Sequence, residues 1–115
     1  MAVTIYHNPR CMKSRQTLAL LQKKGVEPKI VEYLKTPPDA KTLSSILDKL
    51  GIEPRALMRQ KEAPYKANKL DNDKLTRKQL IDAMVANPVL IERPIVLSGA
   101  KAAIGRPPEA VLDIL

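Results

Sequence analysis

Cys11 is the only cysteine in the 115-residue chain, and it lies in a basic segment. Arg10 precedes it, Lys13 and Arg15 follow within four positions, and the only histidine, His7, lies four residues upstream. A cysteine thiol beside cationic groups ionises at a lower pH than a free thiol, and the thiolate is the nucleophilic form. This polar, basic setting therefore predicts a reactive Cys11 rather than a buried, inert one.

Two roles for His7 remain open, because the residue can either interact with the Cys11 thiolate or close the preceding strand through a backbone hydrogen bond. A metal site is not expected. The pair His7 and Cys11 offers two ligands, whereas a structural zinc site takes four protein ligands and a catalytic site three. The backbone N–H groups that follow Cys11 would instead point at an anion, as helix N-termini commonly do.

The spacing around Cys11 argues against two known kinds of thiol chemistry. A loop of the low-molecular-weight phosphatase type needs an arginine six positions after the cysteine, and Thr17 occupies that position. A dithiol oxidoreductase motif needs a second cysteine three positions on, where this chain has Ser14. With a single cysteine the chain cannot form an internal disulfide, so any thiol that resolves a bond to Cys11 has to come from another molecule. A free thiol is typical of proteins in a reducing compartment.

The elements around the cysteine follow from hydrophobic pattern and turn residues. Residues 3–7 predict a β-strand that ends before the turn-forming Pro9. Helical periodicity begins at about residue 12, and Gly25 is the expected C-terminal cap. Residues 29–33 predict a second strand, which a right-handed crossover would place parallel to the first. The cysteine therefore lies where a strand gives way to a helix.

The middle of the chain is predicted to be helical. Thr36 is the expected cap of one helix, with Asp39 at the capping-box position, and Thr76 with Gln79 forms the capping box of another. Between these helices, residues 54–73 predict a short helical turn followed by a loop with some helical character.

The C-terminal quarter predicts a β-hairpin and a last helix. The hairpin consists of residues 95–97 and 101–104 joined at Ser98-Gly99, and the helix spans 110–115. The whole order predicts an α/β fold: a thioredoxin-like mixed β-sheet flanked by helices, with a helical insertion, in a single domain over residues 1–115. In that architecture Pro94 is a cis-proline that faces Cys11.

Composition excludes several classes of partner. The formal net charge is +8, but Lys and Arg are scattered, and three tyrosines with no Trp or Phe leave few stacking platforms for nucleic acid. No apolar run approaches the roughly 20 residues that span a bilayer, and no secretory signal opens the sequence. We expect a cytoplasmic monomer that binds neither nucleic acid nor membrane.

Several segments carry a specific resemblance. Residues 5–11 with Ser14-Arg15 resemble the active-site segment of glutaredoxin-linked arsenate reductases, and the similarity extends over residues 55–59, 92–96 and 105–109. The resemblance implies that Cys11 is the nucleophile, with His7 beside it in the catalytic segment. It also implies an arsenate-binding triad, a glutathione co-substrate and a glutaredoxin partner, with no bound cofactor. The triad consists of Arg59, Arg93 and Arg106.

One residue departs from that pattern, and two other functions remain open. Met12 stands where relatives usually carry Ser or Gly, and its bulk could narrow the pocket. One alternative is a thiol-dependent oxidoreductase or transferase of another substrate. The other is a regulatory, protein-binding module akin to regulators that bind RNA polymerase. Those regulators switch through a pair of cysteines, and Ser14 removes the second cysteine here.

Overall fold

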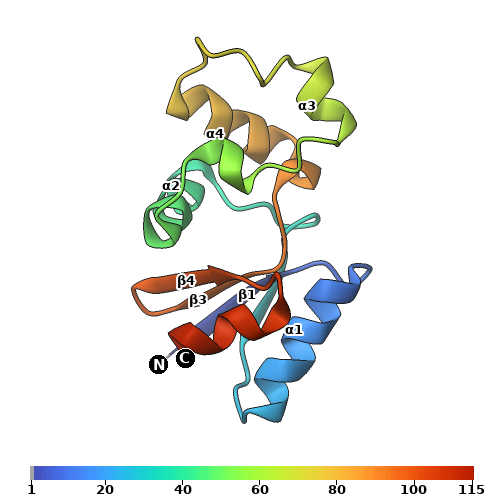
Figure 1. Ribbon diagram of the computed structural model, residues 1–115, viewed down its shortest axis with the longest axis vertical. Coiled ribbons are helices and arrows are strands. Elements are labelled where there is room, and N and C mark those ends of the chain that lie inside the picture. Colours follow the sequence, from blue (N-terminus) through green and yellow to red (C-terminus); the bar gives the residue numbers. More distant parts are fainter. Residues whose placement is uncertain (1) are drawn as a thin grey trace. The chain divides into compact units, whose positions relative to one another are not determined.

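The computed structural model describes residues 2–115, which form two compact units (Figure 1). The first unit combines the residues up to 36 with residues 93–115, and the second consists of residues 37–92. The second unit is thus an insertion in the chain of the first. That the whole chain acts as a single domain stays a prediction.

A four-stranded mixed sheet organises the first unit. Its strand order is β2-β1-β3-β4, with β1 parallel to β2 and antiparallel to β3, and with β3 antiparallel to β4. The strands are β1 (Val3–His7), β2 (Lys29–Glu32), β3 (Ile95–Ser98) and β4 (Lys101–Ile104). This arrangement, with a helix between β1 and β2 and a terminal hairpin, confirms the predicted thioredoxin-like fold.

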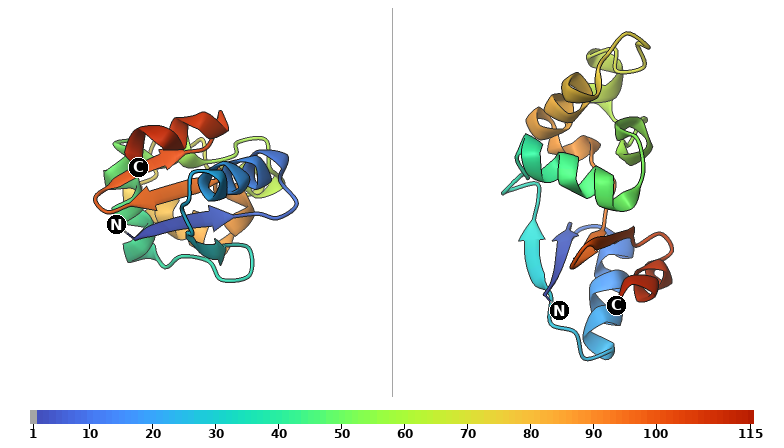
Figure 2. Two further views of the ribbon diagram at one scale, coloured as in Figure 1. Left: turned by 90° about the horizontal axis from the view of Figure 1, so that it is seen from below. Right: turned by 90° about the vertical axis from the view of Figure 1, so that its left-hand side faces the viewer.

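Two helical elements cover one face of this sheet, as the views in Figure 2 show. They are α1 (Met12–Lys23) and a C-terminal 3-10 helix, η3 (Pro108–Ile114), which pack on each other as well as on the strands. The core beneath them joins Ile5 and Val96 of the sheet to Leu21 of α1 and Val111 of η3, all fully buried. Because α1 is fixed by this core, its first turn has a defined place at the end of β1.

The second unit consists of α-helices and short 3-10 helices joined by loops. Its α2 and α4 pack together, and α4 also contacts the 3-10 turns η1 and η2. The elements are α2 (Ala40–Leu50), η1 (Pro54–Leu57), α3 (Ala63–Ala67), α4 (Arg77–Ala86) and η2 (Pro88–Leu90). The helical insertion is therefore confirmed, including the capping box of Thr76 and Gln79 at the start of α4.

The cap predicted for the first helix of this unit was wrong. Asp39, not Thr36, caps α2, and its carboxylate accepts a hydrogen bond from the Thr42 N–H at 2.7 Å. The reason is local: a residue that precedes proline is driven out of the helical region, and both Thr36 and Pro37 precede prolines. The helix therefore begins only after Pro38.

At the C-terminus the structure also differs from the prediction. The expected helix over 110–115 is a 3-10 helix that starts at Pro108, with the Ala110 N–H donating to the Pro107 carbonyl at 3.0 Å. The peptide bonds before Pro94 and Pro107 are both cis, which confirms the expectation for Pro94.

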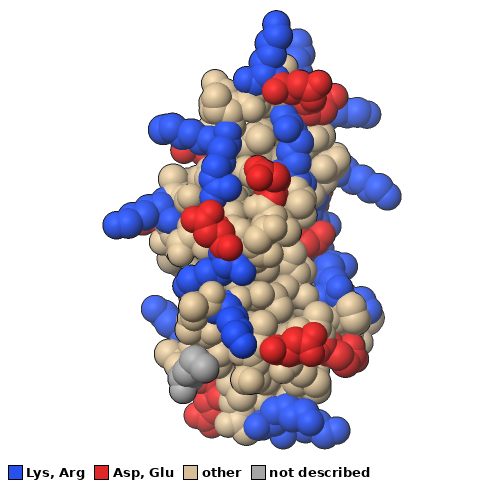
Figure 3. All heavy atoms as spheres, turned by 60° about the vertical axis from the view of Figure 1, so that its left-hand side comes forward, with Lys and Arg blue, Asp and Glu red and all other residues tan. Residues whose placement is uncertain are grey.

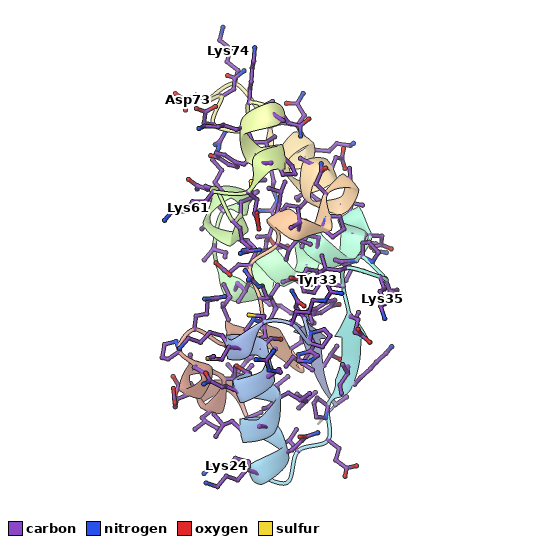
Figure 4. The ribbon with its side chains drawn as sticks, turned by 90° about the vertical axis from the view of Figure 1, so that its right-hand side faces the viewer. Lys24, Tyr33, Lys35, Lys61, Asp73 and Lys74 are labelled. Atoms are coloured by element: carbon purple, nitrogen blue, oxygen red, sulfur yellow. The ribbon has the colours of Figure 1, made fainter. Side chains whose placement is uncertain are left out.

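Charged side chains are dispersed on the surface. The face drawn in Figure 3 carries Lys and Arg interspersed with Asp and Glu rather than a single basic block. In the second unit, the labelled Lys61, Asp73 and Lys74 project away from the packed helices (Figure 4). Within residues 2–115, no helix combines the length and the apolar character that crossing a membrane requires.

Replacing Asp39 with Ala should lower the urea midpoint of unfolding, because α2 loses its N-terminal cap. The Thr42 backbone and side chain hold the pKa of the Asp39 carboxyl below its usual value, so the stabilisation is present at neutral pH and is lost as the pH falls through that pKa. The difference between wild type and Asp39→Ala should therefore vanish in acid. Thr36→Ala is the matched control, and a loss equal to that of Asp39→Ala would contradict the assignment.

Candidate active site

Cys11 lies in the turn that joins β1 to α1 and is the N-cap residue of that helix. Its backbone N–H donates to the Asn8 carbonyl at 3.0 Å, and the Arg10 N–H donates to the Asn8 side-chain oxygen at 3.0 Å. These bonds close a tight loop, in which the Cys11 residue is 8% exposed. Asn8 thus fixes the loop from both its main chain and its side chain.

Ser14 ties this loop to the helix and to the strand. Its hydroxyl oxygen accepts the Asn8 N–H at 3.0 Å and lies 2.6 Å from His7 Nδ1, and the residue is fully buried. The sequence pattern identified Ser14 as the residue in place of a second cysteine and as part of the active-site segment, but it did not predict these hydrogen bonds. The available signal was its position, one helical turn after Cys11 and therefore on the same side of α1.

The His7 ring is buried at the end of β1 and bonds to the Ser14 hydroxyl. Burial lowers the pKa of the imidazole, and Arg15 lowers it further, against an opposing effect of Glu32. The ring is therefore neutral at pH 7, and its Nδ1 can accept the Ser14 hydroxyl proton. This bond to a side-chain hydroxyl is neither of the two roles that the sequence left open. A catalytic role stays a prediction.

Two arginines accompany the thiol in the same unit. The Arg106 guanidinium donates through Nη2 to Cys11 Sγ at 3.7 Å and through Nε to the Arg93 carbonyl at 2.9 Å. Arg93 immediately precedes the cis-proline Pro94 at the start of β3. The structure therefore brings together Cys11, Arg93 and Arg106, which lie far apart in the sequence.

The balance of burial and charge makes Cys11 acidic. Burial on its own raises the pKa of the thiol, but the Ser14 N–H, the Arg93 charge, the Lys13 N–H and the Arg106 charge together outweigh it. The pKa of Cys11 therefore lies below the ordinary thiol value. A thiolate held by amide donors at a helix start and by guanidinium groups is a nucleophile suited to an electrophilic oxyanion.

Arg59 belongs to the second unit and is described there. Its backbone N–H donates to the Leu90 carbonyl at 2.7 Å, and its guanidinium group pairs with the Glu62 carboxylate at 2.7 Å. The nearby Arg55 has a different environment, because its guanidinium donates to the carbonyls of Leu70 and Asn72 at 2.9 and 2.6 Å. Membership of Arg59 in an anion-binding triad stays a prediction.

Comparison with known proteins identifies the family. The model of the ArsC family matches residues 6–114, which is nearly the whole described chain. The chain belongs to the ArsC family.

Individual relatives agree over their full lengths. The Haemophilus influenzae arsenate reductase is 53% identical, with 100% of both chains covered. An Escherichia coli K12 protein named uncharacterized protein YfgD is 58% identical over 98% of this chain and 96% of its own length. The solved structure of an arsenate reductase from Vibrio cholerae superposes with a TM-score of 0.97 at 49% identity, covering 100% of this chain and 98% of that one.

Met12, whose bulk was expected to narrow the pocket, is 62% exposed. Its side chain therefore extends into solvent from the first turn of α1. The two N–H groups that lower the Cys11 pKa come from Lys13 and Ser14. The larger residue is thus accommodated without loss of those two donors.

The Cys11 thiol should titrate below the free-thiol value of about 8.5, as measured by thiolate absorbance across pH. Arg93→Ala should raise the midpoint, because it removes a positive charge that favours the thiolate. Lys24→Ala, at the other end of α1, is the control and should leave the midpoint in place. A wild-type midpoint at or above about 8.5 would show that burial outweighs the donors.

Proposed function

We propose that this ArsC-family protein reduces arsenate to arsenite, with Cys11 as nucleophile and glutathione and glutaredoxin as electron donors. One observation carries the proposal: a solitary thiol at a helix start, with a guanidinium 3.7 Å from its sulfur and a pKa below the ordinary value. Relatives that are 46–53% identical and bear the name arsenate reductase support the choice of substrate.

Arsenate binding is assigned to Arg59, Arg93 and Arg106 together with the amides that follow Cys11. Planar guanidinium groups donate paired hydrogen bonds to a tetrahedral oxyanion and offset its charge. Such donors stabilise the negative charge that builds on the oxygens when a nucleophile attacks. His7 acts as a positioning residue in this scheme, because its ring bonds to Ser14, whose N–H lowers the Cys11 pKa.

The first chemical step is an exchange without electron transfer. The Cys11 thiolate attacks arsenic, a sulfur–arsenic bond forms, and one arsenic–oxygen bond breaks. The departing oxygen takes a proton and leaves as water. Arsenic is still pentavalent in this adduct, so two electrons remain to be supplied.

The second stage needs two external thiols, because the chain has one cysteine. Glutathione contributes the first: its sulfur bonds to the arsenic of the adduct, a second arsenic–oxygen bond breaks, and the departing hydroxyl group takes the thiol proton and leaves as water. A glutaredoxin thiolate then attacks the glutathione sulfur, forming a mixed disulfide and passing two electrons to arsenic. Water adds to the trivalent arsenic, arsenite leaves, and the Cys11 thiolate returns. The two thiols together lose two electrons, which balances the reduction of arsenic.

The donors also agree with the expected surroundings of the protein. Glutathione and glutaredoxin operate in a reducing compartment, where a solitary thiol stays free. A cytoplasmic location is therefore part of the proposal. The protein is proposed to act as a monomer, because the cycle assigns no step to a second copy of the chain.

Replacing Arg59, Arg93 or Arg106 with Ala should weaken arsenate or sulfate binding by roughly 10- to 100-fold, as expected for a lost charge-assisted hydrogen bond. Isothermal titration measures the affinity, and circular dichroism reports the fold. Arg55→Ala is the matched control: it removes bonds to two carbonyls, so it should lower stability and leave anion affinity unchanged. Unchanged affinity in all three variants would refute the triad.

Cys11→Ser should abolish arsenite production, because a serine hydroxyl is hardly ionised at neutral pH. Wild-type protein with arsenate alone should yield at most an arsenylated enzyme by intact mass. Glutathione should then give a mixed cysteine–arsenic–glutathione adduct, and only a complete glutaredoxin system should sustain turnover. Multiple turnovers without an external thiol, or turnover by Cys11→Ser, would overturn the mechanism.

A further inference from the structure

Gly105 is buried at the end of β4, where the backbone comes unusually close to two other segments. A Cβ atom built on this glycine would lie 2.5 Å from Thr17 Oγ1, 3.0 Å from Thr17 Cγ2 and 2.8 Å from Pro94 Cγ. Real Cβ atoms essentially never approach other atoms to less than 3.0 Å. Close approach therefore requires glycine here.

Both neighbours of Gly105 are themselves fixed. Thr17 is fully buried on α1, and its hydroxyl donates to the Lys13 carbonyl at 2.8 Å. Pro94 is buried at the start of β3, and its carbonyl accepts the Gly105 N–H at 2.9 Å. An added methyl group would clash with the side chains of both Thr17 and Pro94, so the segment that carries residue 105 would have to move.

The residue that moves with Gly105 is Arg106. Its N–H donates to the Ile104 carbonyl at 2.9 Å, and its guanidinium reaches the Arg93 carbonyl at 2.9 Å and Cys11 Sγ at 3.7 Å. Cys11 is the N-cap of α1, the helix that also carries Thr17. The contact between Gly105 and Thr17 therefore lies between the thiol's helix and the arginine's segment.

We propose that Gly105 is a positioning residue, which sets the distance between the Arg106 guanidinium and the Cys11 sulfur by letting its backbone rest directly on Thr17 and Pro94. Gly105 itself touches no reacting atom. The inference deepens the proposed function and rests on it for its catalytic consequence alone.

The direction of the effect follows from the contact. Moving a Cβ from 2.5 Å to the ordinary contact range, which begins at 3.4 Å, requires a displacement of about 1 Å. Retreat of the guanidinium from the sulfur weakens its attraction for the thiolate. Gly105→Ala should therefore shift the thiol titration midpoint upward.

The experiment compares Gly105→Ala, Thr17→Ala and the double variant by thiolate absorbance titration and by the pH dependence of iodoacetamide alkylation. Gly105→Ala should raise the midpoint. The double variant should give an intermediate value, because the two Thr17 atoms are gone while the Pro94 contact remains. Val111→Ala, a core substitution on η3, should lower the unfolding midpoint without moving the thiol titration, which separates positioning from general destabilisation.

An unchanged thiol midpoint in folded Gly105→Ala, or an equal shift in Val111→Ala, would overturn the proposal. If Gly105→Ala alone does not fold, the thiol midpoint of the double variant is compared with that of Thr17→Ala. A higher midpoint in the double variant supports the proposal, and equal midpoints overturn it. Neither titration nor alkylation uses arsenate. If the wild-type protein does not reduce arsenate but Gly105→Ala shifts the thiol midpoint, the proposed reductase activity is refuted and the positioning role of Gly105 stands. If the wild-type protein reduces arsenate but Gly105→Ala leaves the midpoint unchanged, the positioning role is refuted and the reductase activity stands.

Discussion

The site depends on holding one negative charge in a place that is nearly closed to water. Burial of the Cys11 thiol opposes ionisation, and the protein offsets it with backbone N–H groups at the start of α1 and with the guanidinium groups of Arg93, just before β3, and Arg106, just after β4. The backbone donors belong to a helix that is packed in the core, and the two arginines flank the hairpin. Fixed dipoles and charges stabilise an anion without reorganising around it.

Ser14 shows how the backbone donors are kept in place. Its N–H favours the thiolate, while its hydroxyl joins the Asn8 amide and the His7 ring. In a dithiol oxidoreductase this position would hold the resolving cysteine. Here a serine uses the position to brace the loop, and the resolving chemistry is transferred to an external thiol in the proposed cycle.

The arginines of each unit have their own local partners. Cys11, Arg93 and Arg106 belong to the sheet-containing unit, and Arg59 belongs to the helical one, where it pairs with Glu62. Arg55 and Arg59 lie one helical turn apart in sequence yet have different partners: carbonyl oxygens for the first and a carboxylate for the second.

What the sequence determined by itself is local. Alternating apolar residues, the Thr76–Gln79 box and the hairpin turn fixed the strands, α4 and the order of elements, because each acts within a few residues. The Asp39 cap could also have been inferred, since the prolines at 37 and 38 exclude an earlier start. A reactive Cys11 likewise followed from its basic, pre-helical setting, and the family resemblance supplied the arginines.

Only the tertiary structure decided which groups meet. Arg106 reaches a sulfur 95 positions away, and neither spacing nor composition encodes such a contact. The His7–Ser14 bond depends on how α1 leaves β1, and the need for glycine at 105 arises from Thr17 and Pro94, which come from two other segments. Backbone hydrogen bonds and hydrophobic periodicity are short-range signals. Close approach and charge placement are properties of the packed chain, and they exist only once sheet and helix have closed around the same core.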